Sequence, residues 1–398
     1  MIAAVRISPR DPLIARDGRP FSPGGSNRVR CLDWPYPSTM AGAMRTLLGN
    51  RSAPARNGRF DEALISRLKR VEVGGPFFSY QGQLFWQAPR DLLPVGDDDG
   101  IRARPLRPQP CASGAGCNLP HAELWPIGVN TGAKPTLAPA FWSSERLADW
   151  LAEDSAAGLA LPSLDGASVG QKAAQEGYLS HLPKETRVHV GIDHYSGTAQ
   201  EGLLYQTEGL VFGEDAALML RVEVSDVELA AQLAGLRCLA TLGGERRLAE
   251  FMAVDGIDWS MPRSVSQALA GARAVRMLLA TPALFDQGWL PGWVEPSSMR
   301  GTPPGMPGLW LRLRGATLER WRPISGWDLH ARGPKAGRRL APAGSVYFFE
   351  VEQGDPAALA ELWLKSISDN PQDCCDGFGL VMWGRWDPRQ MGGGRSGE

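Results

Sequence analysis

The sequence of 398 residues contains only six cysteines and no apolar run of about 18 residues. A membrane-spanning helix needs such a run, so we expect no membrane partner. The opening stretch MIAAVRIS also lacks the apolar core of a secretory signal peptide. Few, scattered cysteines argue against a disulfide framework in a chain of this length. These absences predict a cytoplasmic protein with reduced thiols.

The motifs of common enzyme classes are also absent. No P-loop, HExxH motif, nucleophile elbow or Rossmann fingerprint occurs. Cys111, Cys117 and His121 offer three zinc ligands, but no fourth ligand is evident and the CASGAGC spacing is not that of a zinc knuckle. The run of residues 97–99, all Asp, is either a magnesium site or a solvated turn, and no second carboxylate cluster supports the metal. We therefore expect no metal and no cofactor.

Charge of one sign is not in excess, because the formal net charge is -1. The chain thus has no global basic field, although a groove for nucleic acid needs only a local positive cluster. The 42 basic residues comprise 36 Arg and 6 Lys. Arg offers a planar fork to phosphate and stacks on bases, so this bias is typical of RNA contact, but a GC-rich genome explains it equally well.

A loop rich in Gly, Pro and Arg separates the first expected strand, 2–8, from the first expected helix, which Ser38 caps and Gly49 ends. Its four arginines are Arg16, Arg19, Arg28 and Arg30. Such a composition builds no core but can place guanidiniums beside phosphates. Solvated loop arginines are the alternative interpretation.

The stretch KETRVHVGIDHYSGTAQEGLLYQTE, residues 184–208, predicts a long hairpin. Val188, Val190 and Ile192 alternate with polar residues, the pattern of a half-buried strand. A polar turn at 194–197 follows, so we expect the arms to pack at the base while the middle stands clear of the core. The hairpin is either an ordinary connection or a functional projection.

Hydrophobic spacing predicts regular elements along most of the chain. A helix over 61–70 and two strands within 71–86 come first, and a clear strand follows at 218–224. Residues 89–139 are rich in Pro and Gly, and we interpret them as inserted loops.

Two later stretches share one order of elements. A helix over 227–242 is followed by the glycine loop LGGERR and a strand, and a helix over 355–367 is followed by GFG and a strand. Between them we expect strands at 275–279 and 346–351 and a hairpin over 309–321 that turns at Gly315-Ala316. The pattern predicts an α+β fold of two β-α-β-β-α-β units, which we divide into domains 1–258 and 259–398.

Several motifs carry a family resemblance. VHVGIDHYSGTAQEGLLY, LGGERR, RPISGWDL and RLAPAGSVYFFEV, together with RDPLIARDGRPF and WPYPSTMAGAMRTLLG near the N-terminus, resemble the third subunit of the type III-B CRISPR effector, the Cmr complex. They span nearly the whole chain in the family's order. This family belongs to the RAMP superfamily, so the resemblance implies two ferredoxin-like (RRM-like) units with long inserted loops, glycine-rich loops and a protruding thumb hairpin.

The resemblance also implies a non-catalytic RNA-binding subunit. It would hold the repeat-derived 5′ handle of the guide RNA and contact both the large polymerase-cyclase subunit and the adjacent RAMP backbone subunit. The hairpin at 184–208 would be the thumb that interrupts the guide between handle and spacer. An RNP pattern is missing, so we expect loops rather than an open sheet to bind RNA.

The residues that we expect to contact RNA are mostly basic and lie in these loops and in the hairpin. They are Arg16, Arg19, Arg28, Arg30, Arg45, Lys184, Arg187, His189, Tyr195, Gly243, Gly244, Arg246, Arg247, Lys335, Arg338 and Arg339. The double glycine allows close backbone approach, and the following Glu245, Arg246 and Arg247 can orient and neutralise phosphate.

The alternative function is that of a RAMP endoribonuclease that processes guide precursors. Such relatives use a His to move a proton at the 2′-hydroxyl. The five histidines here are His121, His181, His189, His194 and His330, and none has an evident acid or base partner. We therefore expect no catalytic residue.

Overall fold

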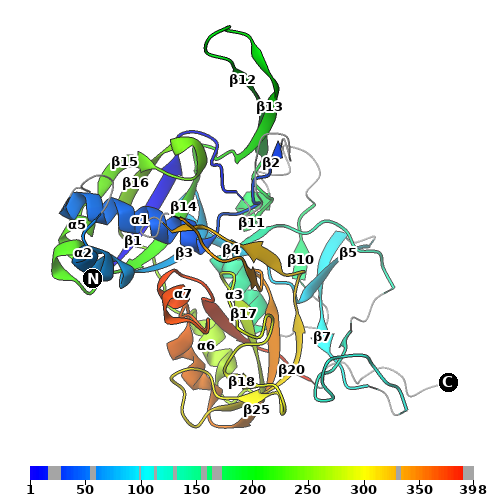
Figure 1. Cartoon of the computed structure of the whole chain (residues 1–398). Helices are drawn as coiled ribbons and strands as arrows, with labels where there is room; N and C mark the ends of the chain where they lie inside the picture. Colours follow the sequence, from blue (N-terminus) through cyan, green and yellow to red (C-terminus); the bar gives the residue numbers. More distant parts are fainter. Residues whose placement is uncertain are drawn as a thin grey trace.

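The computed structural model describes residues 1–16, 28–53, 60–97, 100–111, 114–128, 132–153, 159–163, 173–328 and 333–388. Figure 1 shows an N-terminal half in blue to green, a C-terminal half in yellow to red below it, and a long hairpin that projects from the top. No helix among these residues is long and apolar enough to cross a membrane.

An eight-stranded antiparallel sheet organises the N-terminal half. The first strand, β1, lies between β14 and β16, so the four central strands have the order β16-β1-β14-β3. From one edge to the other the strands are β11 (Tyr178–Leu179), β9 (Phe141–Ser143), β4 (Gln83–Gln87), β3 (Glu72–Tyr80), β14 (Ala216–Glu223), β1 (Ile2–Pro9), β16 (Leu248–Val254) and β15 (Arg237–Thr241). The alternating pattern at 2–8 and 218–224 correctly predicted β1 and β14.

Both faces of this sheet are buried. Helices α1 (Pro37–Ser52), α2 (Glu62–Lys69) and α5 (Val227–Leu233) pack on one face. Phe78 of β3 joins their apolar cluster, whereas its neighbour Phe77 points to the other face and joins the cluster of the C-terminal half. The two halves therefore share a core, and the division at residue 258 stays a prediction.

A six-stranded antiparallel sheet forms the C-terminal half. Its order is β18 (Val294–Glu295), β19 (Arg300–Gly301), β20 (Trp310–Thr317), β25 (Val346–Gln353), β17 (Ala274–Leu279) and β26 (Val381–Arg385). Helices α3 (Ser144–Ala152) and α6 (Arg263–Leu269) lie between the two sheets. A 3-10 helix (Pro356–Leu362) and α7 (Pro371–Cys375) connect β25 to β26. Residues 280–309, all of them described, contain two short strands and no helix where the expected repeat has one.

The region 89–139, which we expected to be loops, contains strands. A small sheet of β5 (Leu92–Asp97), β6 (Gly100–Pro105) and β10 (Leu159–Leu161) stands beside the main sheet. Short pairs are formed by β7 (Arg107–Pro108) with β8 (Ile127–Gly128), β21 (Arg322–Ile324) with β24 (Arg338–Leu340), and β22 (Trp327–Asp328) with β23 (Gly333–Pro334). The Pro and Gly residues hid these strands, because edge strands and two-stranded pairs tolerate both.

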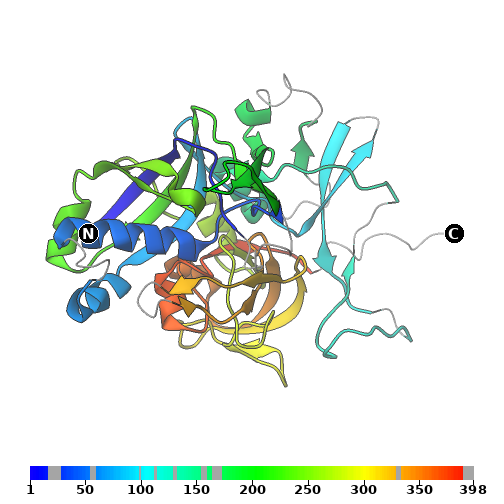
Figure 2. The ribbon, with the colours of Figure 1, turned by 45° about the horizontal axis from the view of Figure 1, so that its top comes forward.

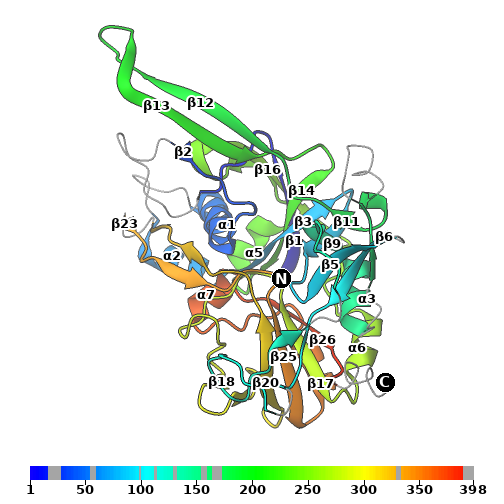
Figure 3. The ribbon, with the colours of Figure 1, turned by 90° about the vertical axis from the view of Figure 1, so that its right-hand side faces the viewer.

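The predicted hairpin is present as β12 (Lys184–Ile192) and β13 (Ala199–Leu210), and β2 (Arg28–Val29) pairs beside β13. Leu210 exchanges two backbone hydrogen bonds of 2.8 Å with Leu13, which anchors the root, and the arms extend away from the body (Figure 3). Figure 2 views the hairpin nearly end-on, with its root near the middle of the molecule. The expected half-buried face is wrong, because Val188 and Val190 are 61% and 48% exposed.

Three further boundaries differ from expectation. Helix α1 begins at Pro37 rather than after a Ser38 cap, and it continues through Gly49, which packs tightly against Phe60. Residues 237–241 form β15 instead of helix, because the chain turns at Gly235, at a φ of 63°, and pairs with β16. Gly315 lies inside the single strand β20, where it admits Pro108 at close range, and forms no hairpin turn.

Candidate nucleic-acid interface

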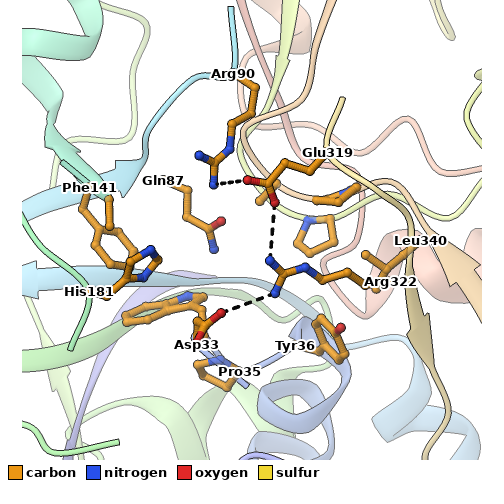
Figure 4. A pocket seen from close by; sticks show the side chains of 15 residues that line it. Asp33, Pro35, Tyr36, Gln87, Arg90, Phe141, His181, Glu319, Arg322 and Leu340 are labelled. Carbon is orange, nitrogen blue, oxygen red and sulfur yellow. Dashed lines mark hydrogen bonds and ion pairs between the residues drawn. The ribbon is translucent and has the colours of Figure 1, made fainter. Parts of the chain in front are cut away.

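A surface groove of about 960 Å³ opens between the root of the hairpin and the loop that precedes β21. Three segments supply its walls, namely 30–36, the hairpin root and 319–323. Its charged lining residues are Arg30, Asp33, Lys184, Glu208, Glu319, Arg320 and Arg322. Segments far apart in sequence, from both halves of the chain, thus meet at one site. A small cavity of about 50 Å³ adjoins the groove (Figure 4).

Ion pairs of alternating sign tie these walls together. Lys184 Nζ lies 2.6 Å from Asp33 Oδ1, and Arg322 lies 3.6 Å from the other oxygen of Asp33. Arg322 and Arg90 both contact Glu319, as Figure 4 shows. Burial favours a raised pKa for Asp33, but the hydrogen bond and charge of Lys184 outweigh it and lower the pKa overall. This carboxylate therefore stays ionised and links the hairpin root to the C-terminal half.

Two cations of the groove are left available. Arg30 and Arg320 are exposed, and neither forms an ion pair with any described residue. An unpaired guanidinium in a groove attracts anions and suits phosphate in particular. These two side chains give the groove its free positive charge.

An exposed tryptophan lies between two of the groove's arginines. Trp321 follows Arg320 and precedes Arg322, and its ring is 46% exposed. The guanidinium of Arg339 lies 4.5 Å from the centre of the ring, a cation–π contact. The backbone of Arg339 pairs with Pro323 in the β21–β24 ladder, which brings this residue beside Trp321. The groove thus offers an aromatic surface beside its free cations.

The two faces of the hairpin differ in chemistry. Lys184, Val188, Val190 and Leu204 share one face by the register of β12 and β13, and Lys184 at its root enters the groove. The apolar members of this face are exposed, from 48% for Val190 to 61% for Val188. A projecting apolar face of this kind is typical of a contact surface.

The opposite face is basic and aromatic. His189 stacks on Tyr205 at a centroid distance of 4.9 Å and lies 2.8 Å from the Thr207 hydroxyl. The hydrogen bond and charge of Glu185 raise the pKa of Arg187, and the charge of Glu245 in the glycine loop adds a smaller effect in the same direction. The hairpin therefore stands between the groove on one side and the glycine loop on the other.

The double glycine serves the fold. Gly243 has a φ of 73°, and a Cβ at this position would lie 2.6 Å from the carbonyl oxygen of Ile14. The Gly244 N–H donates to the same oxygen at 2.8 Å. Both glycines are therefore required by the approach of the loop to the chain after β1.

The arginines of this loop have different surroundings. Arg247 is only 10% exposed, pairs with Glu245 at 2.8 Å and donates to the Pro12 carbonyl at 3.2 Å. Arg246 is exposed, has a φ of 52° and has no ion-pair partner among the described residues. Of the two, Arg246 is the one available to a ligand.

Other candidate residues lie away from the groove or are engaged by the protein. Arg45 is 13% exposed, pairs with Asp376 and donates to the Val71 and Cys375 carbonyls, so it joins α1 to α7. Arg338 binds Asp373 with both terminal nitrogens, at 2.6 and 2.8 Å. Helix packing and burial decide these pairings, which local sequence does not show.

The remaining candidates are exposed or lie outside the described residues. Lys335 and Tyr195 are exposed, the latter by 97% at the hairpin tip. Arg16 bridges to Cys31 beside the groove through its backbone. Arg19 lies outside the described residues, and Arg28 is described only by its backbone in β2.

The residues considered for metal and for proton transfer are dispersed. In the described part of the chain no three His, Cys, Asp or Glu side chains are placed to hold a metal ion. A hydrogen bond with the Cys117 thiol raises the pKa of Cys111, but both ring nitrogens of His121 lie 3.1 Å from backbone atoms. Residues 98, 99 and 330 lie outside the described segments.

Sequence reasoning missed Arg320, Trp321 and Arg322. A signal was present, because the run Arg-Trp-Arg interleaves cations with an aromatic residue, as nucleic-acid-binding surfaces do. We had placed Trp321 at the end of an expected hairpin, where the ring had no evident function. In contrast, Trp34, Trp125, Trp289 and Trp293 are buried or packed against the core.

Comparison with solved structures identifies a related fold. A chain of the cryo-EM structure of the Type III-B Cmr-beta bound to cognate target RNA superposes with a TM-score of 0.50 and 16% identity, over 95% of this chain and 96% of that chain. A chain of the same assembly with target RNA and AMPPnP gives 0.46 and 15%, over 87% and 86%. A chain of the Csm3–Csm4 subcomplex of a type III-A CRISPR-Cas interference complex gives 0.39 and 10%, over 88% and 94%. A search of curated proteins found no match.

The family follows from the sequence as a whole. The family model described as CRISPR-associated protein (Cas_Cmr3) matches residues 5–386. A match over nearly the full length makes this a CRISPR-associated protein. The chain belongs to the Cas_Cmr3 family, and the resemblance inferred from the motifs is confirmed.

Proposed function

We propose that this chain is a non-catalytic RNA-binding subunit of a type III-B CRISPR ribonucleoprotein that holds the 5′ handle of the guide RNA. The observation that carries the proposal is the groove, in which Arg30 and Arg320, neither of which pairs with a carboxylate of the described residues, lie beside the exposed Trp321. Single-stranded RNA is bound by cations that follow its phosphates and by aromatic rings that stack on its bases. The groove supplies both.

The fold supports assignment to the RAMP superfamily. The orders β16-β1-β14-β3 and β26-β17-β25-β20 are the same when each set is numbered along the chain. We infer two ferredoxin-like units, the second of which replaces its first helix by the segment 280–309.

We further propose that the chain bridges the large polymerase-cyclase subunit to the adjacent RAMP backbone subunit. Support for the second contact comes from the exposed apolar face of the hairpin, where Val188, Val190 and Leu204 lie outside any core. A neighbouring subunit that covers this face would remove apolar surface from water.

The proposal predicts that Arg30→Ala combined with Arg320→Ala weakens binding of a single-stranded RNA with the cognate handle. Each lost phosphate contact lowers the salt dependence of log K by about 0.7, so the pair removes about 1.4 from the slope. Affinity falls by on the order of tenfold or more, since a charged hydrogen bond contributes about 1.5 kcal/mol. Filter binding across a salt series measures both quantities.

Arg273→Ala is the matched control, because this exposed arginine precedes β17 and lies at the far end of the C-terminal sheet from Trp321. It leaves slope and affinity unchanged. If the double variant behaves like this control, RNA does not occupy the groove.

The absence of catalysis is a separate prediction. His189 contacts Tyr205 and the Thr207 hydroxyl, and His194 lies beside Tyr195 at the tip, so neither faces a carboxylate or a second imidazole as general acid–base catalysis requires. We expect the purified chain to leave labelled precursor RNA intact, and His189→Ala and His194→Ala to leave it equally intact. Metal-independent cleavage that disappears in either variant, seen on a denaturing gel, would establish the endoribonuclease function instead.

A further inference from the structure

Trp321 exposes its ring inside the groove, and binding of RNA phosphates alone does not require an aromatic ring there. Trp310 and Trp321 are the most exposed tryptophans among the described residues, at 45% and 46%, and they lie at opposite ends of β20. Trp321 alone of the two lines the groove. Because its exposed indole opens into the groove that also contains Arg30 and Arg320, Trp321 is placed to contact a ligand bound there.

We propose that one unpaired purine base of the bound RNA stacks on Trp321. This stacking site would give base specificity, and it rests on the proposed function of the groove. The Arg339 guanidinium covers the ring at 4.5 Å, and stacking on an indole uses its two faces only. With one face taken by Arg339, a single base stacks on the other. The ladder pair Pro323–Arg339 places the backbone of Arg339 two residues from Trp321 across the β21–β24 pair.

The charges around the ring identify the ligand as a nucleotide. Within the described part of the chain Arg30 and Arg320 form no ion pair, and both line the same groove, so a ring that reaches Trp321 meets positive charge on its flank. A nucleotide brings a planar base and a phosphate together and satisfies both features. An apolar peptide side chain would use the ring but leave the two cations uncompensated.

The purine preference follows from stacking area. A purine has two fused rings and overlaps the indole more fully than a pyrimidine, and modest sequence preferences of this kind come from stacking strength. The cation behind the indole draws electron density from it and favours an electron-rich partner. We therefore expect adenine or guanine at the handle position that stacks on Trp321.

An abasic scan of the handle tests the stacking site at Trp321 through a double-mutant cycle. Each handle nucleotide is replaced in turn by an abasic residue, and affinity is measured with the wild-type chain and with Trp321→Ala. One position should lose about 5- to 100-fold in the wild type, as expected for a stacked base, and less than twofold in Trp321→Ala. Uracil at that position should bind more weakly than either purine.

Two further variants sharpen this experiment. Trp321→Phe keeps a smaller ring and should retain most of the affinity, whereas Trp310→Ala is the matched exposed tryptophan and should change nothing. A 2-aminopurine placed at the handle position whose abasic substitution weakens wild-type binding most should be quenched on binding to the wild-type chain. The latter measurement needs no variant and stands even if Trp321→Ala fails to fold.

The outcomes distinguish failure of the stacking site at Trp321 from failure of the proposed function. If Arg30→Ala with Arg320→Ala lowers the salt dependence of binding while Trp321→Ala couples to no handle position, RNA occupies the groove but no base stacks on Trp321. A uniform loss in Trp321→Ala, without coupling to one base, also overturns the stacking site, because the ring then only shapes the groove. If neither set of variants changes binding, the proposed function fails as well.

Discussion

Asp91→Ala is expected to lower the free energy of unfolding by about 3–5 kcal/mol, the largest effect on stability predicted for this chain. Asp91 is completely buried and accepts hydrogen bonds from Arg276 at 2.7 Å, Arg107 at 3.0 Å and the Trp150 indole at 2.7 Å. Its removal takes a shared carboxylate from two buried guanidiniums, and removing one partner of a buried ion pair costs far more than removing one partner of an exposed pair. Urea unfolding followed by tryptophan fluorescence measures the change.

The control for this variant is Arg10→Ala. Arg10 is 58% exposed and pairs with Glu250 at 2.6 Å, and an exposed ion pair contributes about 0–1 kcal/mol. The two substitutions remove pairs of similar geometry at opposite extremes of burial. Equal, small losses for both would show that the buried network adds nothing that a surface pair does not.

The network also explains how the two halves are held in one orientation. Arg276 lies on β17 in the C-terminal sheet, whereas Asp91 precedes β5, and 185 residues separate them. Arg276 also donates to the Trp150 and Glu153 carbonyls at the end of α3. Partial unfolding of Asp91→Ala should therefore begin where the halves meet.

Replacement of the hairpin tip, residues 195–198, by a short glycine linker is expected to spare the fold and abolish the correct guide register in the assembled complex. Asp193 closes the tip by accepting hydrogen bonds from the Tyr195 and Ser196 amides, and nothing in the tip reaches the core. A change in loop length alone costs little in closure entropy. The thermal melt should stay nearly constant.

Assembly depends on the tip in a different way. If the hairpin separates handle from spacer, a shortened tip no longer wedges the guide, and the adjacent backbone subunit loses its register. Nuclease protection of the guide, reconstituted with the partner subunits, reports this loss. Normal protection after a normal melt would contradict the thumb assignment, whereas a collapsed melt would place the turn in the core.

The root of the hairpin, unlike its tip, is packed against the body of the protein. Gly209 packs against Pro12, where a Cβ would come within 2.9 Å, and residues 207–210 are buried. The exposed stripe of Val188 and Val190 therefore does not support the hairpin, contrary to the pattern-based expectation. Alternation predicts that one face is apolar, but it does not say whether that face meets the chain's own core or a partner.

The sequence by itself determined the local elements and the family. Alternation and turn chemistry predicted β1, β3, β4, β14 and the long hairpin, because side-chain period and a Gln81-Gly82 turn are encoded within a few residues. The same local reasoning failed at β15 and at Gly315. There the outcome depends on a partner strand, or on a close neighbour such as Pro108, from a distant part of the chain.

Only the tertiary structure decided the site. Lys184 meets Asp33 across 151 residues, and Arg322 reaches the same carboxylate from the other half of the chain. These contacts engage some cations and leave others, such as Arg30 and Arg320, unpaired. Composition gives the number of arginines but not which of them are paired or buried. Pairing and burial are set by topology and packing between residues far apart in the sequence.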